Sequence, residues 1–150
     1  MADPSRRSFI KTISGSTLAL CCGSTGLSVL LNSCTSIKYI QPIIKNNKIT
    51  VSINEFAENK FVVVNTEQLP SSIYLNKIND SSYSALLMLC THKNCSVNPT
   101  GSFLTCPCHG SQFSNKGKVL RGPAEERLTE YQVLINEKQI TIDLNQAIKL

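Results

Sequence analysis

Two short stretches decide how this 150-residue chain is built: residues 90–95 read Cys-Thr-His-Lys-Asn-Cys, and residues 106–111 read Cys-Pro-Cys-His-Gly-Ser. Together they hold four of the seven cysteines and both histidines of the chain. Thiolates and imidazoles are the ligands that zinc and iron–sulfur centres use. We therefore interpret the region between Cys90 and Pro123 as a long irregular insertion that carries the chemistry.

The segments on both sides of this insertion have the patterns of β-strands. Ile49, Val51 and Ile53 alternate with polar residues, and residues 61–64 form a β-branched run. The predicted strands cover residues 49–53, 61–64, 73–78, 85–89, 131–135 and 140–142. The last two read as a hairpin around residues 136–138, and residues 124–130 could form a turn of helix. The sequence thus predicts an all-β fold of antiparallel sheets.

Length and composition exclude several classes of protein. A chain of 150 residues is about one domain, which argues against two-lobed enzymes. The net charge is +5, hydrophobic residues make up 41% and charged residues 17%, and the basic residues lack the aromatic platform or motif of a nucleic-acid binder. We expect one folded core and no nucleic-acid partner.

The two stretches resemble the Rieske [2Fe-2S] protein family, whose pattern is Cys-x-His-x-x-Cys followed by Cys-x-Cys-His-Gly. The resemblance covers about residues 49–144 and implies a Rieske-type fold with a two-loop cluster-binding subdomain and one [2Fe-2S] cluster per chain. By position, Cys90 and Cys106 would bind one iron, and His92 and His109 the other. Cys95 and Cys108 match the disulfide pair of the high-potential branch.

A zinc site is the alternative interpretation of the same residues, since four Cys and two His offer enough ligands for a tetrahedral centre. Zinc would leave two of these six residues without a role, whereas the Rieske arrangement uses all six. A non-redox lipoprotein that uses the cluster or zinc as a structural clamp is a further alternative.

Neighbouring residues are expected to tune the cluster. Two neutral imidazoles in place of two thiolates leave the centre less negative, which raises its reduction potential. By the resemblance, Ser111 donates a hydrogen bond to a bridging sulfide, and Phe113 stands where the highest-potential members have a donating tyrosine. Gly122 and Pro123 resemble the loop that covers the cluster.

The N-terminus has the features of an export signal. Arg6 and Arg7 precede Phe-Ile-Lys and then twenty uncharged residues, 12–31, a pattern similar to twin-arginine signals. Residues 31–34, Leu-Asn-Ser-Cys, resemble a lipobox with Cys34 as the lipidated residue. We favour cleavage before Cys34 over retention of residues 1–33 as a membrane anchor, because Gly, Ser and Thr are frequent in this segment.

The expected organisation is therefore a signal or anchor over residues 1–33, a tether over 34–48 and a Rieske domain over 49–150. The fourteen residues 35–48 would reach roughly 45 Å when extended. The localisation implied is the bacterial cell envelope, membrane-anchored, with the cluster domain on the periplasmic side. Clusters are assembled in the reducing cytoplasm and disulfides persist outside it, so export of the folded domain reconciles the two.

The sequence favours one-electron transfer with no substrate chemistry of the chain's own. The expected role is a subunit of a cytochrome bc-type complex, with the small subunit of a periplasmic oxidoreductase resembling arsenite oxidase, or an oxygenase ferredoxin, as alternatives. Lys93 and Asn94 replace the Leu-Gly usual in cytochrome bc Rieske subunits, which puts quinol docking in doubt. Residues 81–124 carry four basic and no acidic residues, which suggests an acidic docking face on a partner such as cytochrome b or c or an oxidoreductase large subunit.

Overall fold

The computed structural model describes residues 37–148, which belong to one compact unit. The predictions for Arg6, Arg7 and Cys34 lie outside the described residues. Within residues 37–148, no helix is long and apolar enough to cross a bilayer. One 3-10 helix, η1 (Ile53–Phe56), is the helical element of this part of the chain.

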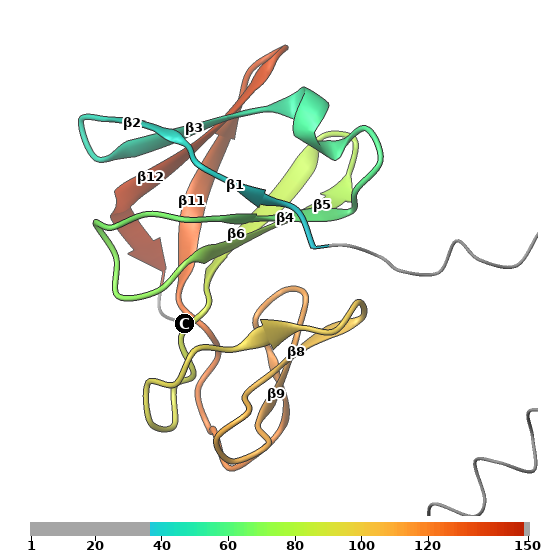
Figure 1. The fold of residues 1–150 in the computed structure, drawn as a ribbon, viewed down its shortest axis with the longest axis vertical. Helices are drawn as coiled ribbons and strands as arrows, with labels where there is room; N and C mark the ends of the chain where they lie inside the picture. Colours follow the sequence, from blue (N-terminus) through green and yellow to red (C-terminus); the bar gives the residue numbers. More distant parts are fainter. Residues whose placement is uncertain (1–36, 149–150) are drawn as a thin grey trace, which may run out of the picture. The chain divides into compact units, whose positions relative to one another are not determined.

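An eight-stranded sheet forms the body of the domain, in the strand order β1-β4-β5-β6-β11-β12-β3-β2. Its strands are β1 (Tyr39–Ile40), β2 (Ile43–Lys45), β3 (Lys48–Ser52), β4 (Phe61–Val64), β5 (Ile73–Asn79), β6 (Ser82–Leu87), β11 (Glu130–Ile135) and β12 (Gln139–Ile148). All pairs are antiparallel except β1 with β4. The two edge strands, β1 and β2, are joined by Gln41 and Pro42 alone, so the sheet curls until its edges approach each other, as Figure 1 shows.

A second sheet of four short strands lies at the lower end of Figure 1, between β6 and β11 in the chain. It has the order β10-β9-β8-β7 and consists of β7 (Asn98–Pro99), β8 (Phe103–Thr105), β9 (Gln112–Ser114) and β10 (Val119–Arg121). We call residues 88–129 the cluster-binding subdomain. Its two Cys-His loops lie at the ends of these strands, residues 90–95 before β7 and residues 106–111 between β8 and β9.

Two apolar cores hold the domain together. The first fills the curled sheet with side chains that alternate inward along its strands, such as Ile49, Val51 and Ile142, all nearly inaccessible to solvent. The second joins the two sheets and includes Tyr74, Leu86, Leu104 and Phe113. Cys90 and Cys106 also belong to this second core, so the cysteines predicted as ligands are anchored in packed apolar surroundings.

The structure confirms the all-β prediction with strands on both sides of the insertion. β4 covers residues 61–64 as expected, and β11 and β12 pair as a hairpin around residues 136–138. Three expectations were wrong. Residues 39–45, assigned to the tether, form β1 and β2; the region 90–123, expected to be irregular, contains β7–β10; and residues 124–130 form no helix. Strands of two or three residues, such as β7–β10 of the small sheet, have no measurable periodicity, so sequence patterns do not predict them.

Candidate metal centre

The two Cys-His loops share one backbone pattern. In the first, the Cys90 N–H donates to the Cys95 carbonyl at 2.8 Å, and the Asn94 N–H donates to the Cys90 carbonyl at 2.9 Å. In the second, Cys106 N–H donates to the Ser111 carbonyl at 2.8 Å, and Gly110 N–H donates to the Cys106 carbonyl at 3.0 Å. The chain thus builds two similar turns, each beginning at a buried cysteine.

Each turn needs a left-handed residue at its fifth position. Gly110 has φ +77° and Asn94 has φ +55°. Glycine takes this conformation without steric cost, and asparagine is the side chain that tolerates it best among the others. Asn94 is therefore compatible with the same turn that Gly110 makes in the second loop.

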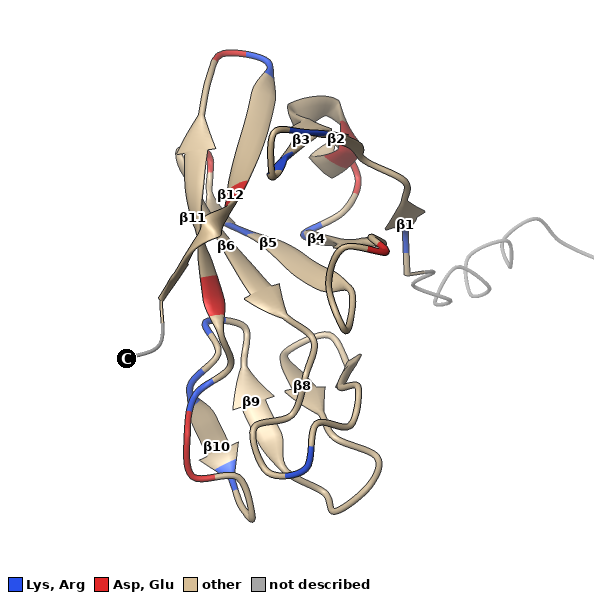
Figure 2. Ribbon diagram, turned by 90° about the vertical axis from the view of Figure 1, so that its left-hand side faces the viewer, with Lys and Arg blue, Asp and Glu red and all other residues tan. Residues whose placement is uncertain are grey.

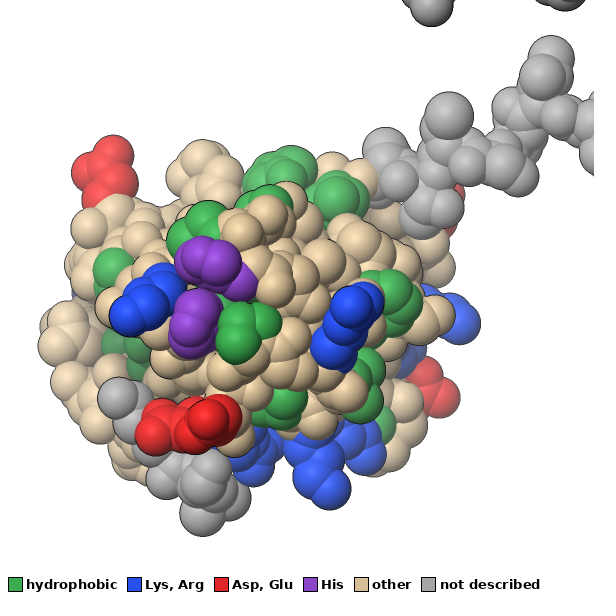
Figure 3. Space-filling view, turned by 90° about the horizontal axis from the view of Figure 1, so that it is seen from below, with side chains coloured by type: hydrophobic (Ala, Val, Ile, Leu, Met, Phe, Trp, Pro, Cys, Tyr) green, Lys and Arg blue, Asp and Glu red, His purple; other side chains and the backbone are tan. Residues whose placement is uncertain are grey.

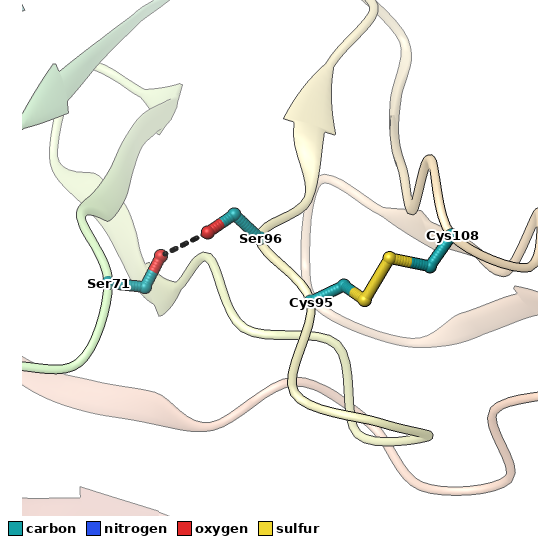
Figure 4. The surroundings of a disulfide bond; sticks show 4 residues. All are labelled: Ser71, Cys95, Ser96 and Cys108. Atoms are coloured by element: carbon teal, nitrogen blue, oxygen red, sulfur yellow. Dashed lines mark hydrogen bonds between the residues drawn. A yellow bond between two sulfur atoms is a disulfide. The ribbon is translucent and has the colours of Figure 1, made fainter.

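A disulfide joins the two loops. The Sγ atoms of Cys95 and Cys108 are bonded, and their Cα atoms lie 6.5 Å apart. In Figure 4, the neighbouring Ser96 hydroxyl lies 3.4 Å from the hydroxyl of Ser71, which follows β4 in the body of the domain. Ser71 also donates to the Met88 carbonyl at 2.9 Å. The first loop is thus fastened both to the second loop and to the large sheet.

The disulfide narrows the choice of metal ligands. The sulfurs of Cys95, Cys106 and Cys108 lie within 4.8 Å of one another, but two of them are bonded to each other and cannot act as thiolates. The free cysteines of the described chain are Cys90 and Cys106, both buried. They remain the thiol ligands available in the two loops.

The two histidines meet at the end of the subdomain. Their ring centroids lie 4.9 Å apart, with the rings nearly perpendicular. His109 is exposed and His92 is half-buried, and Figure 3 shows the pair side by side on the surface. One edge of this pair faces solvent, where a partner can approach it.

His92 has a feature that fits a metal ligand. Its Nδ1 atom is buried and has no hydrogen-bond partner within residues 37–148. A buried polar atom without a partner carries a free-energy cost, and such an atom needs either an ion or a donor beside it. With the two buried thiols and the imidazole of His109, this nitrogen gives the kinds of donor that a Rieske centre needs, two sulfurs and two imidazole nitrogens.

A third segment, residues 122–126, packs beside the two loops. The Ala124 N–H donates to the Ser111 hydroxyl at 3.0 Å, and the Thr91 hydroxyl donates to the Glu126 carbonyl at 2.6 Å. Because the Ser111 oxygen accepts from Ala124, its own hydrogen remains available to donate. Gly122 and Pro123, predicted to belong to the loop that covers the cluster, are exposed on this segment.

Phe113 lies in the middle of the small sheet. Its Cα is paired with Leu104 of β8 and with Val119 of β10, and the residue has no solvent exposure. It shares the second core with Cys90 and Cys106. A phenyl ring in this core offers no hydrogen bond.

Charges of both signs surround the histidines. Lys93 is exposed beside His92, and Glu125 and Glu126 are exposed on the third segment, whose backbone is bonded to Thr91 of the first loop. Figures 2 and 3 show basic and acidic residues together at this end of the molecule. The expectation of a basic cluster end rested on residues 81–124 and omitted these two glutamates; the cluster-binding subdomain, residues 88–129, contains five basic and two acidic residues, 5 − 2 = +3.

Two contacts of the site had no signal in the sequence. The hydroxyl of Thr91 donates to the backbone carbonyl of Glu126, and the hydroxyl of Ser71 donates to that of Met88, both distant in the chain. A hydroxyl that binds a remote carbonyl leaves no spacing or periodicity to detect. Asn94 did carry a signal, because asparagine is enriched at left-handed positions.

Comparison with known proteins identifies the family. Residues 46–132 match the model of the Rieske [2Fe-2S] domain, more than half of the chain. The cytochrome b6-f complex iron-sulfur subunit of Chlorobaculum tepidum is 28% identical over an alignment of 159 positions that covers 95% of this chain and 77% of that protein. The corresponding subunit of Prochlorococcus marinus strain MIT 9301 is 33% identical over 75 residues, which are 49% of this chain and 42% of that protein. The chain thus spans less than half of the second relative.

Solved structures give the same result for the fold. The plasma membrane Rieske protein PetC3 from Synechocystis PCC 6803 is 29% identical, with a TM-score of 0.53 over 61% of this chain and 93% of that one. A chain of the oxygenase–ferredoxin complex of carbazole 1,9a-dioxygenase has a TM-score of 0.55 at 18% identity, over 70% of this chain and 100% of that one, a likeness of fold alone. From the matched domain, the donor set and the shared fold, the chain belongs to the Rieske [2Fe-2S] family and is an electron-transfer protein that carries a [2Fe-2S] cluster.

Proposed function

We propose that this protein is a membrane-tethered redox subunit of a cytochrome bc-type respiratory complex. The thiolates of Cys90 and Cys106 and the imidazoles of His92 and His109 would hold the cluster, which supplies a one-electron carrier when bound. The observation that carries this assignment is the buried, unpartnered Nδ1 of His92, in a loop that begins at one of the two buried free cysteines of the described chain.

The remaining residues of the site act on access and rigidity. The Cys95–Cys108 disulfide and the Ser71–Ser96 contact hold the first loop in place, which limits the reorganisation that accompanies electron transfer. The thiols lie in the apolar core and are shielded from water, whereas His109 is exposed. Electrons would therefore enter and leave on the histidine side.

The partner is proposed to be a cytochrome. The relatives from Chlorobaculum tepidum and Prochlorococcus marinus are named as subunits of cytochrome b6-f complexes, which supports a cytochrome-type redox partner. Lys93 places an ammonium next to His92, at a position where an apolar side chain would favour docking in a quinol pocket. A basic contact by Lys93, Lys116, Lys118 and Arg121 with an acidic partner face stays part of the proposal, weakened by Glu125 and Glu126.

The second candidate is the small subunit of a periplasmic oxidoreductase. The polar residues Lys93 and Asn94 of the first loop favour this candidate. Both candidates include export by the signal at Arg6 and Arg7, cleavage before Cys34 and lipidation of Cys34. The domain would then lie on the periplasmic side, held at the membrane.

Two experiments test the proposal. Reduced protein should give a Rieske electron paramagnetic resonance signal, which Cys90→Ser and His92→Ala abolish while Thr100→Ala, an exposed control, retains it. Purification from native membranes in mild detergent should recover a cytochrome b with the protein. Recovery of a large periplasmic oxidoreductase subunit would replace the first candidate by the second, and a colourless zinc-loaded protein would refute both.

A further inference from the structure

The outer face of the large sheet carries an apolar surface close to the N-terminal end of the described chain. Ile43 is 75% exposed and Tyr39 is 60% exposed, the two highest values among the large apolar side chains of residues 37–148. The intervening Ile40 and the following Ile44 pack into the first core. Alternation along the strands therefore turns Tyr39 and Ile43 outward.

The strand register extends this surface across four strands. Ile43 is paired with Thr50, Thr50 with Thr141, and Thr141 with Leu134. Residues opposite each other in neighbouring strands point to the same face of the sheet, and Leu134 is 48% exposed. This row contains no charged residue. Tyr39 is not in this row but on β1, which Gln41 and Pro42 connect to β2. We call the row together with Tyr39 the outer stripe.

The next outward row of the sheet is charged. Lys45 is paired with Lys48, and Lys48 with Asp143, to which its ammonium is ion-paired at 3.6 Å. Lys45 is exposed and has no carboxylate partner within residues 37–148. The outer stripe is thus bordered on its β2 edge by a free ammonium.

The position of Cys34 brings this face near a membrane. Five peptide units separate Cys34 from Tyr39, and an extended chain of that length reaches at most about 18 Å. The argument rests on the lipid anchor of the proposed function. With an anchor so close, one side of the large sheet must face the bilayer at short range.

We propose that the outer stripe rests on the phospholipid surface and fixes the orientation of the domain. Tyr39 has the amphipathic ring that favours the headgroup region, and Ile43 and Leu134 supply apolar surface at the acyl boundary. Lys45 lies where an ammonium can meet lipid phosphates. The cluster-binding subdomain, at the other end of the domain from β2 in Figure 1, remains free to meet its partner.

The absence of tryptophan from the sequence makes the test direct, because a single introduced tryptophan is the sole indole reporter. The lipidated full-length protein would carry either Ile43→Trp or Leu120→Trp and be placed in phosphatidylcholine–phosphatidylglycerol vesicles. Leu120 is the matched control, 59% exposed but on β10 of the other sheet. The tryptophan emission of each protein is compared between vesicles with and without acyl-brominated lipid. The cluster is present in both samples, so its own quenching cancels in this comparison.

We expect the Ile43→Trp emission to shift to shorter wavelength and lose intensity with brominated lipid, and the Leu120→Trp emission to do neither. In a Tyr39→Trp protein, adding Ile43→Glu should abolish the quenching while the protein still pellets with vesicles. If the protein binds vesicles but brominated lipid quenches neither tryptophan, or quenches both equally, the inference about the outer stripe is wrong, whereas the lipid anchor is still supported. Protein that does not pellet at all would overturn the anchor and the inference together.

Discussion

Replacing Phe113 by tyrosine should raise the reduction potential of the bound cluster. Phe113 has no solvent exposure and packs in the same core as Cys90 and Cys106. By the resemblance to the highest-potential Rieske proteins, the added hydroxyl would donate a hydrogen bond to a cysteine thiolate. Such a bond strengthens when the centre gains negative charge, so it favours the reduced form.

The size of the effect follows from one-electron arithmetic. A tenfold change in the equilibrium corresponds to 59 mV for one electron, so that about 1 kcal/mol of preference for the reduced form raises the potential by roughly 43 mV. Hydrogen bonds to charged groups contribute about 1.5–3 kcal/mol, of which only the difference between the two redox states counts. We therefore expect a rise of about 40–60 mV.

Protein-film voltammetry of the two proteins measures this shift, and thermal unfolding provides a second readout. If the hydroxyl finds no sulfur, it is buried without a partner, which costs about 1–3 kcal/mol of stability and leaves the potential unchanged. That outcome would refute the assignment of Phe113. Phe61→Tyr is the control, because Phe61 contacts the same core from β4, where its ring lies 4.9 Å from that of Tyr74; its potential should not move.

Three further predictions concern stability. Replacing both Cys95 and Cys108 by Ser should lower the free energy of unfolding by about 3 kcal/mol, since the bridged residues are 13 apart in sequence, and an unchanged denaturant midpoint would contradict this. Asn94→Gly should leave the melting temperature unchanged or raise it, whereas Asn94→Ala should destabilise by about 1–2 kcal/mol because φ there is +55°; equal melting temperatures for the two would oppose the left-handed assignment. Burial raises the pKa of Tyr74 from 10.0 to about 12. As the pH rises, the unfolded chain therefore loses this proton before the folded protein does. The stability that the protonated tyrosine contributes below pH 10 is thus lost between about pH 10 and pH 12. Tyr74→Phe should reduce that alkaline decline in urea titrations, and an identical pH profile would be inconsistent with it.

The sequence predicted the larger elements and the ligand-bearing loops because those features are local. Residues 49–53 alternate with period two, as in a strand with one buried face, and residues 61–64 form a β-branched run, as in a strand with two. Both patterns lie within the strand itself and can be recognised without knowing its neighbours. The Cys95–Cys108 pairing came from the family resemblance, and the structure confirms it. The small sheet was missed because its strands are held by pairing and by the second core rather than by their own propensity.

Residues 39–45 were assigned to the tether for a different reason, because the sequence that follows them does contain the pattern of a hairpin turn. Asn46 and Asn47 have φ values of +52° and +56°, the two left-handed residues of a two-residue hairpin turn between β2 and β3. Asparagine at both positions, between apolar residues at 43–44 and 49, is typical of such a turn. Pro42 and the polar composition directed the interpretation toward a linker, although proline is compatible with the end of an edge strand.

This correction changes how an anchored domain could reach its partner. A tether over residues 34–48 would allow an excursion of roughly 45 Å, but β1 begins at Tyr39, and a chain from Cys34 to that point reaches about 18 Å at most. The Val63 N–H donates to the Lys38 carbonyl at 2.9 Å and the Asn65 N–H to the Ile40 carbonyl at 3.1 Å, so freeing the segment would break the edge of the large sheet. A domain held this way cannot swing far on its N-terminal link. If Cys34 is the anchor, the partner must bring its own redox centre to the histidine pair, and the orientation set by the outer stripe decides which partners can do so.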